Sequence, residues 1–180
     1  MEELEKVSME ELHHAYVVPS IDRETKQKLH SYFEDTLGVA VHGNPDVIEL
    51  RLETLALQDA RFLIEQASHM PLGKAKFFIV SFSFAGAEAQ NALLKLLEEP
   101  TPRTHFFLLV PSLGTLLETV RSRLSVLSVS NDDVDEIGKK FLEANPKERI
   151  TIAKSAIEDK DKSWALALVS SLEHVLHKRL

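Results

Sequence analysis

The chain has 180 residues, of which 44% are hydrophobic and 27% charged, a composition that suits one medium-sized globular domain with room for a small appended module. Its formal net charge of -7 at pH 7 disfavours DNA binding by this chain alone, because DNA-binding proteins usually present a basic face to the phosphates. Cysteine is absent, which excludes disulfides, thiolate metal sites and cysteine nucleophiles and fits a reducing cytoplasm.

Apolar runs and amphipathic segments alternate from the first residues to about residue 130. The apolar runs typical of buried strands are residues 15–18, 47–50, 76–82, 105–110 and 124–129. The segments with apolar side chains at helical spacing are residues 21–37, 56–69, 86–99 and 113–121. Gly38 follows the first helix as the residue most tolerant of positive φ, and Pro100 stops the third. This alternation predicts an α/β fold with a mostly parallel, doubly wound sheet.

The pattern changes after Ser130, where strands are no longer predicted. Three helices follow, at about 132–143, 146–159 and 162–178. Asn145 is a suitable cap for the second of them, with Pro146 in its first turn and Glu148 three residues after the cap. We therefore predict two domains, an α/β domain at residues 1–130 and a small helical domain at residues 131–180.

The helix predicted at residues 86–99 has two distinct faces. Its apolar face is formed by Ala89, Ala92, Leu93, Leu96 and Leu97. Its polar side is expected to carry Glu88, Gln90, Lys95 and Glu98. Because adjacent helical side chains diverge, Glu98 and Glu99 are expected to solvate the helix end and not to act as a pair of carboxylates.

Motifs for common enzyme chemistry are missing from the sequence. No GxSxG, HExxH or GxGxxG pattern occurs, so hydrolase, metalloprotease and dinucleotide-binding functions have no support. His174 and His177 are one turn apart on a predicted helix and could share a metal, but no third ligand accompanies them, so a solvated terminal turn is favoured. His13 and His14 are expected to be structural. We expect no metal and no cofactor.

Residues 91–100, with the sequence NALLKLLEEP, resemble a helix of the AAA+ subunits of bacterial clamp loaders, the γ/τ and δ′ proteins of DNA polymerase III. Four further segments resemble the same family in the same order and spacing: residues 13–16, 59–65, 104–109 and 119–124. The motif helix is represented by Asn91, Leu94, Glu98, Glu99 and Pro100. The resemblance covers about residues 12–130. It implies an AAA+-like (P-loop NTPase-like) fold, with a five-stranded parallel sheet, helices on both faces and a truncated helical lid at 131–180.

The departures from this family concern its nucleotide site. A hydrolysing member would have the phosphate-binding loop GxxxxGK[ST] directly after the first strand, where residues 17–25 of this chain read VVPSIDRET. The family also ends its central strand with acidic residues that hold magnesium, where this chain has Ser81-Phe82-Ser83-Phe84. We therefore expect no ATP hydrolysis by this chain. We also expect this chain to lack the zinc module of many relatives, which needs cysteines, and the collar domain of a full-length relative.

Phe82 and Phe84 lie at the carboxyl end of the predicted central strand, where an open α/β sheet normally binds its ligand. Apolar rings there would fill a phosphate pocket and not serve it. We expect that the nucleotide site has become core or interface.

Arg123 is the candidate site residue that the resemblance points to. The family's Ser-Arg-Cys segment supplies an arginine to the ATP of a neighbouring subunit, and Arg123 takes that position, with Leu124 in place of the cysteine. An arginine supplied in this way raises turnover by roughly 10³–10⁵ because it neutralises transition-state charge. The residues alone favour another role, in which Arg121 and Arg123 complement the negative end of the preceding short helix. When the resemblance is taken into account, the two roles of Arg123 are about equally supported.

The predicted function is that of a non-hydrolysing δ′-like subunit that supports sliding-clamp loading in DNA replication. Its expected partners are other clamp-loader subunits of the γ/τ and δ type, with primed DNA and the sliding clamp reached indirectly through the complex. The alternative is an ATPase-dead AAA+-like scaffold that binds another protein and has no affinity for clamp-loader subunits. An active nucleotide-binding enzyme is disfavoured by the missing loop.

No membrane association is expected, because no apolar run approaches the roughly 18 residues needed to span a bilayer. The first residues, Met1–Lys6, are acidic where a secretory signal is basic and then apolar, so export is not expected. The predicted location is the cytoplasm.

Overall fold

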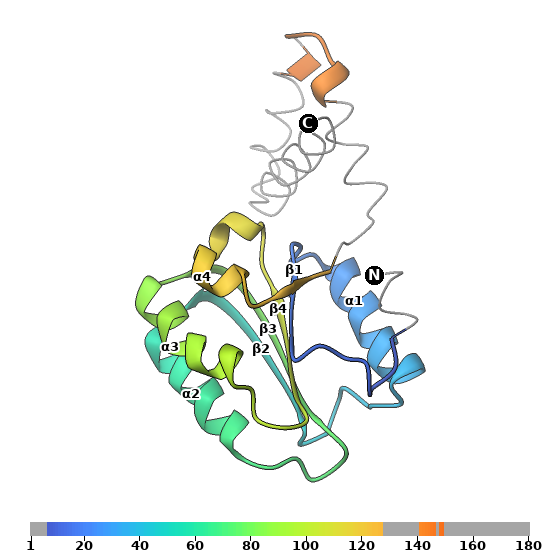
Figure 1. Ribbon diagram of the computed structural model, residues 1–180. Helices are drawn as coiled ribbons and strands as arrows, with labels where there is room; N and C mark the ends of the chain where they lie inside the picture. Colours follow the sequence, from blue (N-terminus) through green and yellow to red (C-terminus); the bar gives the residue numbers. More distant parts are fainter. Residues whose placement is uncertain (1–6, 128–140, 147, 150–180) are drawn as a thin grey trace. The chain divides into compact units, whose positions relative to one another are not determined.

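The computed structural model describes residues 7–127, 141–146, 148 and 149 (Figure 1). The chain divides into two compact units, Met1–Val129 and Ser130–Leu180, each of which is considered by itself. The elements of the first unit are β1 (Ala15–Val18), α1 (Arg23–Ser31), η2 (Tyr32–Thr36), β2 (Val47–Leu55), α2 (Leu57–Ser68), β3 (Lys76–Ala85), α3 (Ala87–Glu98), β4 (Thr104–Leu109), η3 (Leu113–Thr115), α4 (Glu118–Arg121) and β5 (Ser125–Val126).

The five strands form one sheet in the order β2-β3-β4-β1-β5, and every neighbouring pair is parallel. Helices α2, α3 and α4 cover one face of this sheet, and α1 covers the other (Figure 1). The central strand β3 serves both faces: Phe78 and Val80 belong to the core under α2, α3 and α4, whereas Phe77 and Ile79 belong to the core under α1. The predicted parallel α/β sheet is confirmed.

The first predicted helix, residues 21–37, is two elements and not one. Its regular part is α1, and a π-helical turn, η2, follows directly. The Val39 N–H then donates to the Phe33 carbonyl over 2.8 Å, and Gly38 between them has φ 64°. Glycine adopts this left-handed conformation without strain, so the predicted end of the helix at Gly38 is confirmed.

Other boundaries also differ from the prediction. Strand β2 continues to Leu55 and does not stop at Leu50, because Leu52 keeps the alternation of apolar residues and pairs with Phe82 of β3. The helix predicted at 113–121 is broken into η3 and α4, since Leu116 and Leu117 have extended backbone with ψ of 143° and 145°. The last strand, β5, is limited to Ser125–Val126 within the described residues.

The described part of the second unit contains one confirmed helix start. The Asn145 N–H donates to Glu148 Oε2 and the Glu148 N–H donates to Asn145 Oδ1, each over 3.0 Å, which is the reciprocal arrangement of a capping box. The rest of the predicted helical lid, together with His174 and His177, lies outside the described residues. Within the described residues, none of the helices combines the length and the apolar character that crossing a membrane requires.

Candidate functional site

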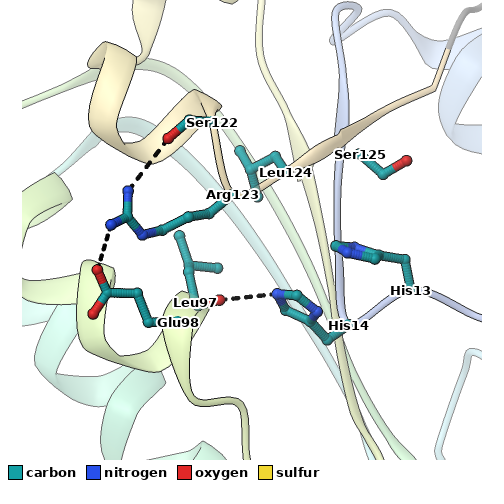
Figure 2. A pocket seen from close by; sticks show the side chains of 8 residues that line it. All are labelled: His13, His14, Leu97, Glu98, Ser122, Arg123, Leu124 and Ser125. Carbon is teal, nitrogen blue, oxygen red and sulfur yellow. Dashed lines mark hydrogen bonds and ion pairs between the residues drawn. The ribbon is translucent and has the colours of Figure 1, made fainter.

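A surface groove of about 580 Å³ lies where the end of α3 meets the segment after α4 (Figure 2). The groove is lined by His13, His14, Leu97, Glu98, Ser122, Arg123, Leu124 and Ser125. Two of the segments singled out from the sequence, the end of the motif helix and the segment around Arg123, therefore line the same groove. The two histidines come from the approach to β1, which lies beside β5 in the sheet.

Arg123 is held by two segments of the chain at once. Its Nη2 forms an ion pair with Glu98 Oε1, and its Nη1 donates to the Thr119 carbonyl and, over 3.3 Å, to Ser122 Oγ. The side chains of Arg123 and Glu98 are 32% and 47% exposed, so the pair lies at the rim of the groove and solvent reaches it (Figure 2). Glu98 is exposed at the helix end, as expected, and its carboxylate is in addition the partner of Arg123, a contact that the sequence did not predict.

His14 closes the inner side of the groove. Its Nε2 donates to the Leu97 carbonyl over 2.9 Å, which satisfies an acceptor in the last turn of α3. The His13 and His14 rings are 4.1 Å apart between centroids. Burial, followed by the proximity of His13, lowers the pKa of His14 below that of a free histidine, although its bond to Leu97 opposes this. His14 is therefore an uncharged donor at neutral pH, whereas Arg123 contributes a positive charge to the groove.

The other members of the motif helix have separate positions. Asn91 is exposed on α3, and Leu94 is half-buried against the core beneath α2 and α3. Glu99 is the exposed residue that ends α3, and Pro100 follows it. Of these family-motif residues, Glu98 is the one that reaches the groove.

Gln90, which the helical pattern placed on the polar side of α3, is instead 3% exposed. Its Nε2 donates to the carbonyls of Ala85 and Thr115, over 3.1 and 3.2 Å, and its Oε1 accepts from the Leu117 N–H over 2.7 Å. This amide fixes the extended link between η3 and α4 and so places the Arg123 segment against α3. The signal for its burial is its spacing, since Gln90, Leu93 and Leu97 follow the i, i+3, i+7 rule of one helix face.

The loop between β1 and α1 occupies the position at which an open sheet of this kind binds ligand. Strand β1 lies between β4 and β5 while the chain continues from it to β2, so its carboxyl end is a topological switch point. In this chain Asp22 caps α1: its Oδ1 accepts from the Thr25 N–H over 2.7 Å, and its Oδ2 accepts from the hydroxyls of Thr25, over 3.0 Å, and Ser20.

The charge state of Asp22 follows from these bonds. Burial alone would raise the pKa of Asp22, but the bonds from Ser20, Thr25 and the Glu24 amide outweigh it, so the net effect is a lowered pKa. A carboxylate therefore stands at the helix end where backbone amides would otherwise receive a phosphate. A phosphate placed on the same amides would meet this negative charge at hydrogen-bonding distance.

The end of β3 is only partly as expected. Phe82 is 1% exposed and belongs to the core under α2 and α3, in agreement with the interpretation of this position as core. Phe84 is 60% exposed, so it is not part of the core. Ser81 Oγ donates to the Leu50 carbonyl over 3.3 Å. Among the described residues, no cluster of three histidine or acidic side chains could hold a metal ion.

The parallel sheet, the helices on both faces and the switch point at β1 define an AAA+-like module of the P-loop NTPase type. Residues 38–133 match the model of the protein family described as "DNA polymerase III, delta subunit", and these residues make up more than half of the chain. The chain therefore belongs to the DNA polymerase III delta-subunit family.

Parts of this chain are also similar to individual relatives and solved structures. The chain is 43% identical over 82 residues to DNA polymerase III subunit delta' of Haemophilus influenzae, a match that covers 44% of this chain but only 21% of that protein. The fold is similar to that of a DNA polymerase III gamma subunit-related protein of Thermotoga maritima, with a TM-score of 0.57 at 19% identity over 94% of this chain and 58% of that one. A DNA clamp loader delta protein of Bacillus subtilis gives a TM-score of 0.49 at 18% identity, over 78% of this chain and 45% of that one.

Proposed function

We propose that this chain is a non-hydrolysing, δ′-like subunit of the DNA polymerase III clamp loader that supports loading of the sliding clamp. Its partners are the γ/τ-type and δ-type subunits, and it reaches primed DNA and the clamp through the assembled complex. Arg123 acts in trans on ATP held by a neighbouring subunit. The family assignment supports the general role, and the position of Arg123 at the rim of the groove is the observation that carries the specific one.

The absence of hydrolysis by this chain is supported by the loop before α1. Phosphate binding at a helix start depends on free backbone amides and on a favourable dipole. Here the Thr25 amide is already bonded to Asp22, and the ionised carboxylate repels a second anion. No acidic side chain follows Phe82 at the end of β3 to hold magnesium, since that segment continues as Ser83-Phe84.

The proposed role of Arg123 is supported by the weakness of its present contacts. An ion pair at this degree of exposure contributes only about 0–1 kcal/mol, because water solvates both charges. A transferring phosphoryl group in a closed interface offers the guanidinium a far stronger partner, which is why such arginines raise turnover by roughly 10³–10⁵. Glu98 holds the guanidinium in place before a neighbouring subunit docks and releases it at small cost.

A second candidate function is an ATPase-dead scaffold of the same fold that binds a different protein. One observation favours it: the Arg123 guanidinium is already satisfied within the chain by Glu98 and the Thr119 carbonyl. In that case Arg123 fastens α4 to α3 and has no role in catalysis.

The deciding experiment measures the DNA-stimulated ATPase rate of the γ/τ-type subunit of the same genome, alone and with this chain. Wild type is expected to raise the rate, and Arg123→Ala is expected to remove the increase while complex formation on a sizing column persists. Arg121→Ala is the matched control, because Arg121 is exposed two residues away and lines no part of the groove. Arg123→Lys is expected to restore little, since lysine lacks the planar fork of the guanidinium.

Each contrary result has a distinct meaning. Complex formation with equal stimulation by wild type and Arg123→Ala would leave the chain a clamp-loader subunit but remove the trans role of Arg123. Failure to bind any clamp-loader subunit would favour the scaffold. Binding of magnesium-ATP by the isolated chain in equilibrium dialysis would contradict the proposal that this chain has lost its nucleotide site.

A further inference from the structure

Strand β2 forms one edge of the sheet, and its outer side is not paired with any strand of the described residues. It is long for an edge strand, running from Val47 to Leu55 (Figure 1). The Phe77 N–H of β3 donates to the Asp46 carbonyl, so the even-numbered residues that follow turn their backbone groups toward β3. The Val47 N–H donates to the Asn44 carbonyl over 3.1 Å. Glu49 and Arg51 therefore present their N–H and C=O groups to the outside, where no strand of the described residues pairs with them.

The side chains of this edge are self-complementary. Ile48, Leu50 and Leu52 are half-buried on the face of the sheet that α2 and α3 cover. On the opposite face, Glu49 and Arg51 carry opposite charges. Charges on an edge strand ordinarily discourage pairing. Here an antiparallel copy with Leu50 opposite Leu50 places each Arg51 opposite a Glu49, which turns repulsion into attraction.

We propose that β2 pairs antiparallel with β2 of a second copy of this chain, with a two-fold axis at Leu50. In this arrangement Ile48 and Leu52 of the two copies lie opposite each other, so apolar meets apolar on one face and charge meets opposite charge on the other. The outward backbone groups of Glu49 and Arg51 form the hydrogen-bonded pairs. A closed two-fold dimer with a continuous sheet results.

The charge of Glu49 is compatible with this pairing. Within its own chain Glu49 forms an ion pair with Lys26, and its Oε2 lies 3.4 Å from His30 Nε2. Arg51 is exposed and has no ion pair among the described residues. In the dimer, Arg51 of one copy joins the Glu49, Lys26 and His30 side chains of the other copy. Arg51 thereby gains an ion-pair partner that the described residues of its own chain do not supply.

This dimer is independent of the proposed clamp-loader role. Strands β2 and β5 are the two outer strands of the sheet, and Arg123 lies just before β5. A partner subunit at the Arg123 groove and a second copy at β2 therefore use opposite edges of the sheet. Either interaction can fail in an experiment without affecting the other.

Cysteine cross-linking tests the register directly, because the chain contains no cysteine. In the full-length chain, Leu50→Cys puts two thiols opposite each other at a non-hydrogen-bonded pair, where the Cα atoms are about 4.5 Å apart and a disulfide fits. Leu52→Cys is the matched control, because its two copies lie about 13 Å apart along the strands in this register. Mild oxidation is expected to link Leu50→Cys and to leave Leu52→Cys unlinked.

The oligomeric state provides the second measurement. Light scattering over about a hundredfold range of protein concentration is expected to show wild type passing from one to two chains. Arg51→Glu makes both charge pairs repulsive and is expected to weaken association about tenfold. Arg61→Glu, an equal charge change at an exposed position of α2, is expected to have no effect. A monomer at every concentration, equal behaviour of Arg51→Glu and wild type, or cross-linking at Leu52→Cys but not Leu50→Cys would overturn the proposal.

Discussion

Replacing Gln90 with alanine is expected to lower the free energy of unfolding by about 2–4 kcal/mol. The side chain is 3% exposed, and its amide serves the carbonyls of Ala85 and Thr115 and the N–H of Leu117. A hydrogen bond of this kind contributes about 1 kcal/mol net, and a buried group left without a partner costs about 1–3 kcal/mol. The greater helix propensity of alanine returns only a few tenths of a kcal/mol, about the difference between the two residues.

The assay is urea unfolding followed by circular dichroism, with Gln58→Ala as the control. Gln58 is an exposed residue of α2, and the same substitution there is expected to change stability by less than about 0.5 kcal/mol. Because Gln90 holds the segment that carries Arg123, Gln90→Ala is also expected to weaken the stimulation of a partner ATPase. If Gln90→Ala and Gln58→Ala unfold at the same urea concentration, the amide does not hold the link between η3 and α4.

Three further outcomes follow from polar groups that are wholly or partly buried. Asp22→Ala is expected to cost about 1 kcal/mol in urea unfolding and Asp22→Asn less, since asparagine also caps helices; equal losses would contradict the cap. Asp46 is 6% exposed and accepts hydrogen bonds from two amides of the loop before β3. Asp46→Ala is therefore expected to lower the free energy of unfolding by roughly 2–4 kcal/mol and to speed tryptic cleavage at Lys74. Unchanged cleavage would show that other contacts hold the loop. Burial lowers the pKa of His105, so the unfolded chain binds its proton first and this contribution to stability is complete above about pH 6.5 and declines below it. His105→Gln is expected to reduce the loss of stability between about pH 7.5 and 5.5 relative to wild type, and an identical pH dependence would refute this assignment.

The order of strands and helices in the first unit could be predicted because its buried strands are short apolar runs and its helices carry one apolar stripe. The ends of the helices and strands were harder to predict from the sequence. Leu116 and Leu117 have helical spacing, but a hydrogen bond from the Leu117 amide to Gln90 holds them extended. Gln90 is 27 residues from Leu117 in the sequence, so the local spacing of apolar residues does not reveal this hydrogen bond.

The groove was predictable in its parts and not in its contacts. The family resemblance singled out both Arg123 and Glu98, yet neither spacing nor composition shows that the two side chains meet. Phe84 illustrates the converse, because its apolar character suggested that it fills the former ligand site, whereas its side chain is 60% exposed. Exposure at the end of a strand depends on where the neighbouring layer stops, which is a property of the folded chain.

The carboxylate that caps α1 makes a gain of phosphate binding at this loop difficult to reach by single substitutions. Introducing glycines alone leaves Asp22 on the amides, where it competes with any incoming anion. Removing Asp22 alone weakens the start of α1 before any ligand is present to compensate. Neither change alone therefore gives a loop that binds phosphate and also keeps the start of α1 stable, so both changes are needed together.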